Sequence, residues 1–188
     1  MDTRTALLDH ATELVRTRGY SGFSYADLAE RVAIRKASIH HHFPSKDDLG
    51  LALLERYHER FEASLLQIAT DHASAPARLR GFAALYRDSL VHKLGCLCGM
   101  LAADVDVISP EMAAGVGRFM RMNQQWLEQV IMQGQQQGSL PVQISAAAVA
   151  GLLLSVCQGG LLIGRAWQSV DDFDRAVAAL WALLQLPD

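Results

Sequence analysis

The chain has 188 residues, of which 51% are hydrophobic and 20% are charged, and its formal net charge is −3. This length and composition fit a folded protein of one or two small domains and exclude a disordered or fibrous chain. Three cysteines, an odd number, argue against a disulfide framework, and the charged start of the sequence does not look like a signal peptide. We therefore expect a cytoplasmic protein.

Apolar residues recur at helical spacing along the whole chain, and no hairpin signal interrupts them. The pattern predicts an all-α fold of about nine helices. Gly, Pro and capping residues delimit the segments. The predicted helices span approximately residues 2–18, 24–32, 36–41, 45–71, 76–94, 96–105, 109–138, 145–168 and 171–186.

The second and third predicted helices are joined by a tight turn and lie between Ser24 and Phe43. The third helix opens with Arg35 and Lys36, followed by two small residues. From Arg31 to Lys46 there are four basic residues and no acidic one, although the whole chain is acidic. A short helix that begins with basic and small side chains can enter the major groove of DNA, so this pair is a candidate DNA-reading element.

The stretch Leu7–Leu49 resembles the DNA-binding domain of the tetracycline-repressor (TetR) family of bacterial transcriptional regulators. The resemblance rests on Leu-Leu-Asp at 7–9, Gly-Tyr at 19–20, Asp-Leu-Ala at 27–29, Lys-Ala-Ser-Ile at 36–39, His-Phe at 42–43 and Ser-Lys at 45–46. It implies a helix-turn-helix domain over residues 1–50 and an effector-binding and dimerisation domain over residues 51–188. The implied DNA-binding residues are Ser24, Tyr25, Arg35, Lys36, Ala37, Ser38, His40, His41 and Lys46.

Three positions depart from the pattern of that family. Ala33 stands where the turn usually has Gly, Arg35 stands where a capping Ser or Thr is common, and His40 replaces a Tyr that often touches phosphate. The run His40–His42 does not suggest a metal site, because consecutive helical side chains point about 100° apart. We expect no metal and no cofactor.

The resemblance further implies that the C-terminal part binds a small molecule and then releases DNA. Candidate pocket or sensor residues are Tyr86, Leu90, Cys96, Met100, Met122 and Trp126. For the large apolar residues, ordinary core packing is the competing interpretation. Cys96 begins a predicted helix, where the helix dipole would favour its thiolate and so its reaction with electrophiles or oxidants. The competing interpretation of Cys96 is a small buried hydrophobe.

The last two predicted helices are too apolar for a solvated monomer surface, and small residues line one stripe of the eighth. The family resembled here forms homodimers through these helices, which would present two DNA-reading elements to a palindromic operator. The candidate interface comprises Gly151, Ser155, Gly159, Phe173, Val177, Leu180, Trp181 and Leu184. The uncharged stretch 144–164 is long enough to span a bilayer, but a buried helix is the favoured interpretation.

Two other functions remain compatible with the composition. A cysteine-dependent enzyme would need a positioned nucleophile, base and oxyanion donors, and the sequence offers only Cys96 with a nearby His. A helical adaptor that binds no DNA would share the composition but not the basic reading helix. The sequence favours a ligand-released repressor that acts as a homodimer and is not an enzyme.

Overall fold

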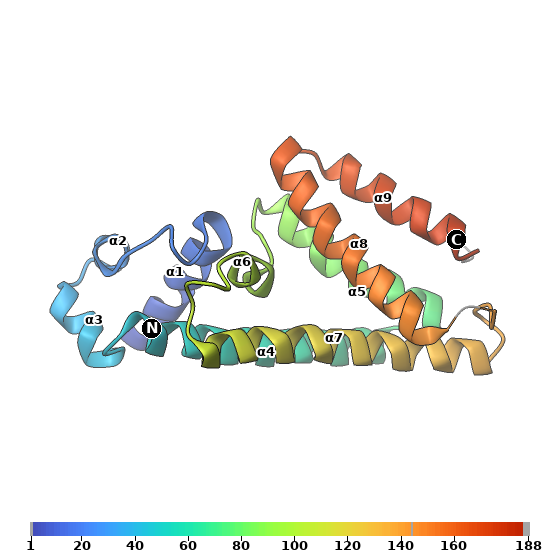
Figure 1. The fold of residues 1–188 in the computed structure, drawn as a ribbon, viewed down its shortest axis with the longest axis horizontal. Helices are drawn as coiled ribbons and strands as arrows, with labels where there is room; N and C mark the ends of the chain where they lie inside the picture. Colours follow the sequence, from blue (N-terminus) through green and yellow to red (C-terminus); the bar gives the residue numbers. More distant parts are fainter. Residues whose placement is uncertain (1, 144, 186–188) are drawn as a thin grey trace. The chain divides into compact units, whose positions relative to one another are not determined.

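The computed structural model describes residues 2–143 and 145–185, which contain nine α-helices and no strand (Figure 1). The helices are α1 (Thr3–Arg18), α2 (Tyr25–Val32), α3 (Lys36–His42), α4 (Lys46–Asp71), α5 (Ala75–Val91), α6 (Leu97–Ala103), α7 (Pro110–Gln136), α8 (Ala146–Trp167) and α9 (Val170–Leu183). The predicted all-α fold is confirmed. Ile144 and Leu186, at which predicted segments begin or end, lie outside the described residues.

Helices α5 and α6 end before the residues at which the sequence predicts their ends. Helix α5 stops at Val91 because the chain turns at Lys93, whose φ of 59° is left-handed, and the Leu94 amide donates back to the Ser89 carbonyl. Helix α6 stops at Ala103 because the backbone turns at Asp104, the C-cap residue. The apolar spacing continues past both points, so periodicity alone overestimates the lengths.

The first compact unit combines the chain up to Arg60 with the segment Cys96–Phe119. Within it, α1 contacts α2 and α6, and α2 contacts α3. The apolar stripe of α1 is fully buried, as predicted, and Arg56 on α4 donates to the Asp9 carboxylate on α1 at 2.5 Å. Helices α2 and α6 therefore pack against α1, α3 packs against α2, and Arg56 ties α1 to α4.

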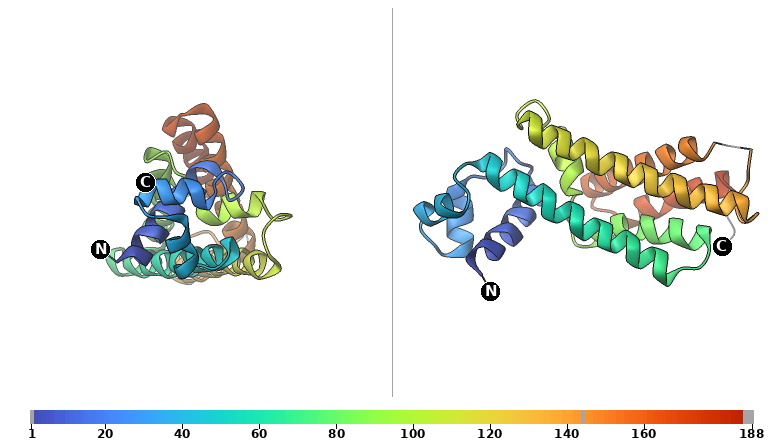
Figure 2. Two further views of the ribbon diagram at one scale, coloured as in Figure 1. Left: turned by 90° about the vertical axis from the view of Figure 1, so that its left-hand side faces the viewer. Right: turned by 90° about the horizontal axis from the view of Figure 1, so that it is seen from below.

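The second unit combines Phe61–Gly95 with the chain from Met120 onward. Helices α8 and α9 form an antiparallel hairpin, and α5 contacts both (Figure 2). Gly160 allows this approach, because a Cβ there would lie 3.1 Å from the Phe173 ring. The Arg87 guanidinium on α5 forms two parallel hydrogen bonds with the Asp174 carboxylate on α9. Helix α8 has the length and hydropathy of a membrane span, but its buried residues take part in this packing.

Candidate nucleic-acid interface

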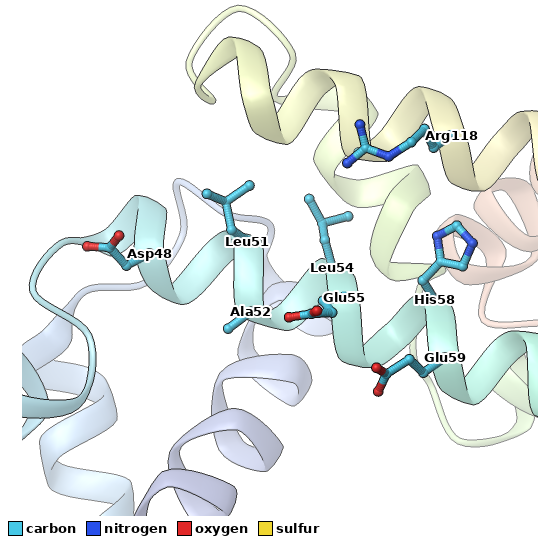
Figure 3. Close-up of a pocket in the computed structure, with 9 residues that line it drawn as sticks. Asp48, Leu51, Ala52, Leu54, Glu55, His58, Glu59 and Arg118 are labelled. Atoms are coloured by element: carbon cyan, nitrogen blue, oxygen red, sulfur yellow. The ribbon is translucent and has the colours of Figure 1, made fainter.

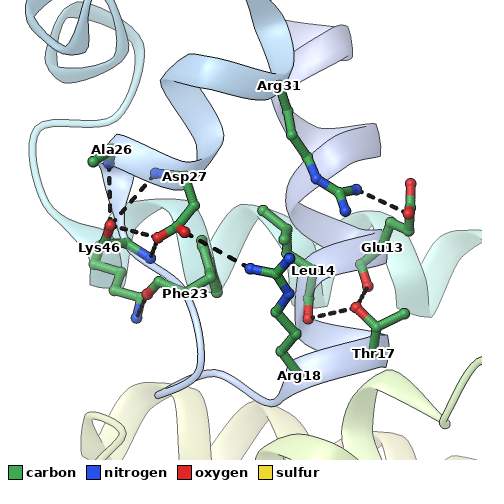
Figure 4. A network of polar contacts seen from close by, with 10 residues as sticks. Glu13, Leu14, Thr17, Arg18, Phe23, Ala26, Asp27, Arg31 and Lys46 are labelled. Atoms are coloured by element: carbon green, nitrogen blue, oxygen red, sulfur yellow. Dashed lines mark hydrogen bonds and ion pairs between the residues drawn. The ribbon is translucent and has the colours of Figure 1, made fainter.

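A capping box fixes the start of α2. The Ser24 hydroxyl accepts from the amides of Ala26 and Asp27, and the Asp27 carboxylate accepts from the Ser24 amide at 2.8 Å (Figure 4). The Ser24 hydroxyl also donates to the Asp27 carboxylate, at 2.6 Å, and this hydrogen bond, with that of the Ser24 amide and with Arg18 at 3.7 Å, lowers the pKa of the Asp27 carboxyl. The capping box is complete, so the Ser24 hydroxyl is already hydrogen-bonded within the protein.

The turn between α2 and α3 is built without glycine. Ala33 adopts the left-handed conformation, with φ 56° and ψ 42°, and the Ile34 amide donates to the Ala29 carbonyl at 3.1 Å. Arg35 is the N-cap residue of α3 and makes no side-chain capping bond. The turn therefore keeps its geometry with some left-handed strain, and the first amides of α3 have no side-chain cap.

Helix α3 separates a buried anchor from an exposed surface. Ile39 is fully buried and Phe43, just after the helix, is 2% exposed. The predicted reading residues on this helix and at its cap are all exposed: Arg35, Lys36, Ala37, Ser38, His40 and His41. A helix held by its apolar side and presenting basic and small side chains on the other matches the geometry of a major-groove reader.

His40 has one ring nitrogen already engaged. Its Nδ1 lies 3.0 Å from the Pro44 carbonyl oxygen, and its ring packs 4.9 Å from that of Tyr25. A carbonyl only accepts, so Nδ1 carries the proton of this bond. Neutral His40 then presents Nε2 as an acceptor, and only the imidazolium form can donate to a phosphate from that atom.

The side chains of Tyr25 and Lys46 both make hydrogen bonds within the domain. The Tyr25 side chain is buried, and its hydroxyl donates to the carbonyls of Phe43 and Ser45 at 3.0 and 2.5 Å. The Lys46 ammonium donates to the carbonyls of Tyr20 and Phe23, each at 2.6 Å. Burial lowers the pKa of Lys46. Both side chains hold the domain together in this structure, and the assignment of Tyr25 and Lys46 to the DNA-binding surface stays a prediction.

The predicted effector residues fall in both compact units. Tyr86 and Trp126, in the second unit, each contact the ring of Phe82, and the Phe82 and Trp126 rings are stacked 5.9 Å apart. Gln158 points its amide at the Tyr86 hydroxyl, 3.4 Å away. Leu90 is buried and Met122 is half-buried. Cys96 and Met100 belong to the first unit, so a single pocket formed by all six residues stays a prediction.

Cys96 and Cys98 are buried beside a tyrosine that the sequence did not single out. The Tyr57 hydroxyl donates to the Cys96 sulfur at 3.7 Å, and the Arg16 guanidinium lies 5.8 Å from the centre of the Tyr57 ring. Burial raises the pKa of Tyr57 and that of the Cys98 thiol well above their usual values. The arrangement gives the Cys96 sulfur an O–H donor, which stabilises negative charge on it.

An open groove of about 540 Å³ lies between α4 and α7 in the first unit (Figure 3). Leu51 and Leu54 point into it from α4, and Arg118 faces them from α7. None of the predicted effector residues lines this groove, which sequence reasoning missed because its walls come from segments about sixty positions apart.

Only part of the candidate dimer surface is accessible in the structure. Gly159 has open space where a Cβ would point, and Gly151 has only one atom at 4.0 Å. Ser155 is exposed and Trp181 is half-buried. The other predicted α9 side chains pack inside the unit, which removes them from the surface: Phe173, Val177, Leu180 and Leu184. Exposed apolar residues instead occupy neighbouring positions: Leu152, Leu162, Ile163, Trp167 and Leu183.

The geometry agrees with what known proteins show. Residues 7–53 match the family of bacterial regulatory proteins described as tetR, and residues 75–180 match the tetracyclin repressor-like C-terminal domain. The transcriptional repressor DhaR of Mycobacterium sp. strain GP1 is 25% identical over 177 residues, covering 90% of this chain and 87% of DhaR.

Solved structures show the same likeness over nearly the whole chain. A TetR-family regulator from Agrobacterium tumefaciens superposes with a TM-score of 0.92 at 30% identity, covering 97% of each chain. Reduced Escherichia coli NemR, a transcriptional repressor, superposes with a TM-score of 0.82 at 26% identity, covering 95% of each chain. The protein is a DNA-binding transcriptional regulator and not an enzyme, and it belongs to the TetR family.

Proposed function

We propose that this protein is a repressor that binds a palindromic operator as a homodimer through α3 and leaves it when a small-molecule effector binds. The observation that carries the proposal is α3 itself, with Ile39 buried and Arg35 and Lys36 exposed at its start. Residues 1–50 would form the DNA-binding domain and residues 51–188 the effector and dimerisation domain, in a cytoplasmic protein.

A selection of genomic fragments by the purified protein tests this function. We expect a palindromic site whose binding weakens as salt rises, because phosphate contacts release counterions. Arg35→Ala with Lys36→Ala should weaken binding and lower the log–log salt slope by about one for each phosphate that is no longer neutralised. The control is Arg121→Ala, which removes an exposed positive charge from the second unit. No fragment enriched above non-specific binding would refute the function.

The exposed apolar side chains of α8 and α9 support the homodimer. Trp167 and Leu162 are 66% and 65% exposed, and Gly159 leaves room for close approach. A second copy of the same hairpin offers a matching apolar face, and a two-fold arrangement pairs two α3 helices with two half-sites. Sedimentation of the purified protein gives the mass, and a monomer at micromolar concentration would contradict this part of the proposal.

We further propose Cys96 as the group through which an electrophile acts. Its sulfur would bond to the β-carbon of an α,β-unsaturated carbonyl compound, and the thiol proton would end on the α-carbon. The Tyr57 hydroxyl supports this step, because an O–H donor at 3.7 Å stabilises the attacking thiolate. N-ethylmaleimide should release the operator from the wild type and not from Cys96→Ser, whereas Cys157→Ser, altered at a buried thiol, should respond like the wild type.

A further inference from the structure

The loop between α1 and α2 begins at a residue that only glycine suits. Gly19 has φ 84° and ψ 167°, a conformation that L side chains rarely adopt. A Cβ at this position would also lie 3.3 Å from a carboxylate oxygen of Asp104. The loop then runs to Ser24, which caps α2. Its conformation therefore decides where the pair α2–α3 begins.

Asp104 binds the amide side of this loop from the C-terminal end of α6. Its Oδ2 accepts from the Tyr20 amide at 2.8 Å and from the Ser21 amide at 3.3 Å. Its Oδ1 accepts from the Ser21 hydroxyl at 3.4 Å. A carboxylate that accepts from two successive amides makes charge-assisted bonds, which are roughly twice as strong as neutral ones.

Lys46 binds the carbonyl side of the same loop from the first turn of α4. Its ammonium donates to the carbonyls of Tyr20 and Phe23 and lies 4.5 and 4.4 Å from the centres of their rings. The amide of Tyr20 is thus held by an anion and its carbonyl by a cation. The Tyr20 hydroxyl adds a third tie, donating to Asp47 at 3.1 Å.

We propose that Asp104 is a positioning residue for DNA binding, which fixes the α1–α2 loop between α6 and Lys46 and thereby sets the placement of α2 and α3. The inference rests on the proposed function of α3. It also links α6 to the reading element, because Cys96 and Asp104 are the N-cap and C-cap residues of this helix and Asp104 is hydrogen-bonded to the loop that precedes α2.

The test compares Asp104→Asn with Asp106→Asn, which removes an exposed negative charge two residues away. Simple electrostatics predicts that removing either charge leaves DNA binding equal or slightly tighter. The positioning role predicts instead that Asp104→Asn weakens operator binding by about tenfold or more, the size expected for the removal of hydrogen bonds to a charged group. The salt slope should stay at the wild-type value because no phosphate contact is removed, and Asp104→Glu should recover part of the affinity.

Hydrogen exchange supplies a readout that does not depend on DNA. The amides of Tyr20 and Ser21 should exchange faster in Asp104→Asn than in the wild type or in Asp106→Asn, while the α1 core keeps its protection. Lys46→Met should likewise weaken operator binding without changing the salt slope. Wild-type affinity in Asp104→Asn, or unchanged exchange at residues 20 and 21, would overturn the proposal. Failure of the wild type to bind any operator would instead refute the function of α3.

Discussion

The hydroxyl of Tyr25, the first residue of α2, donates to the main-chain oxygen of Phe43, the C-cap residue of α3, at 3.0 Å. A second bond from the same hydroxyl reaches the Ser45 carbonyl. The start of one reading helix is therefore fastened to the exit of the other through a buried phenol. This contact and the buried Ile39 fix α3 in the domain and leave its other side exposed.

Replacing Tyr25 with Phe should measure how much this contact contributes to the free energy of unfolding. The change keeps the ring and leaves two carbonyls without their donor, so we expect the free energy of unfolding to fall by about 1–3 kcal/mol. Urea unfolding of the purified protein gives the value. Tyr86→Phe is the matched control, because the Tyr86 hydroxyl receives a longer hydrogen bond of 3.4 Å from Gln158. Equal decreases in the two variants would contradict the structural role of Tyr25.

The free energy of unfolding should also fall at alkaline pH, because the Tyr25 hydroxyl is buried and must stay protonated to donate. Burial raises the pKa of Tyr25 to about 12, above the usual value of 10.0. Since the folded-state pKa is the higher one, the stabilisation is complete below pH 10 and disappears as pH rises toward 12. Burial and Asp47 raise the pKa of Tyr20 in the same direction. Denaturant unfolding between about pH 8 and pH 11 should therefore show a smaller decrease in Tyr25→Phe than in the wild type, and parallel curves would refute the assignment.

Ala33→Gly should stabilise the turn between α2 and α3. Ala33 is left-handed with φ 56°, a conformation that costs an L residue about 1 kcal/mol and glycine almost nothing. We expect a gain of roughly 0.5–1 kcal/mol, reduced by the extra backbone freedom of glycine in the unfolded chain. Ala37→Gly is the control: in the helical backbone of α3 it should destabilise by a similar amount. A decrease in stability in both variants would show that Ala33 is not strained.

The helices and the exposed reading side of α3 were readable from sequence because they depend on local signals. These signals are the apolar spacing, the capping box of Ser24 and Asp27, and the helix-ending Gly19, and each acts over only a few residues. Contacts made across the chain were not readable. Nothing near Lys46 indicates that its amine reaches residues 20 and 23, and nothing near Asp104 indicates the amides of residues 20 and 21. The same limit explains why buried α9 residues were assigned to a surface, since periodicity identifies an apolar side but not what covers it.

Substitutions at two glycines of α8 should distinguish packing within the chain from packing between two copies of it. A Cβ at Gly164 would lie 2.6 Å from Leu90 and 2.9 Å from the Ser169 carbonyl, so Gly164→Ala should destabilise the folded chain itself. Gly159 meets nothing within 4 Å, so Gly159→Ala should stabilise the helix by roughly 0.5–1 kcal/mol. Gly159→Leu should leave the chain folded and weaken the dimer in sedimentation. If Gly159→Leu dimerises as tightly as the wild type, the small residues of α8 are not part of the interface.

The three thiols should react with iodoacetamide at very different rates in the folded protein. Burial raises the pKa of Cys157 to about 12, so at about pH 8 only about one molecule in ten thousand carries the reactive thiolate there. Burial also raises the pKa of Cys98, and the nearby Cys96 sulfur adds to the rise. Peptide mass spectrometry of briefly labelled protein should find Cys96 modified first, because Tyr57 donates to its sulfur. In urea the three rates should converge, since unfolding removes burial and the Tyr57 contact together. Tyr57→Phe should lower the labelling rate of Cys96 and leave that of Cys157 unchanged. If Cys157 is labelled faster than Cys96 in the folded wild type, its placement in the core is wrong.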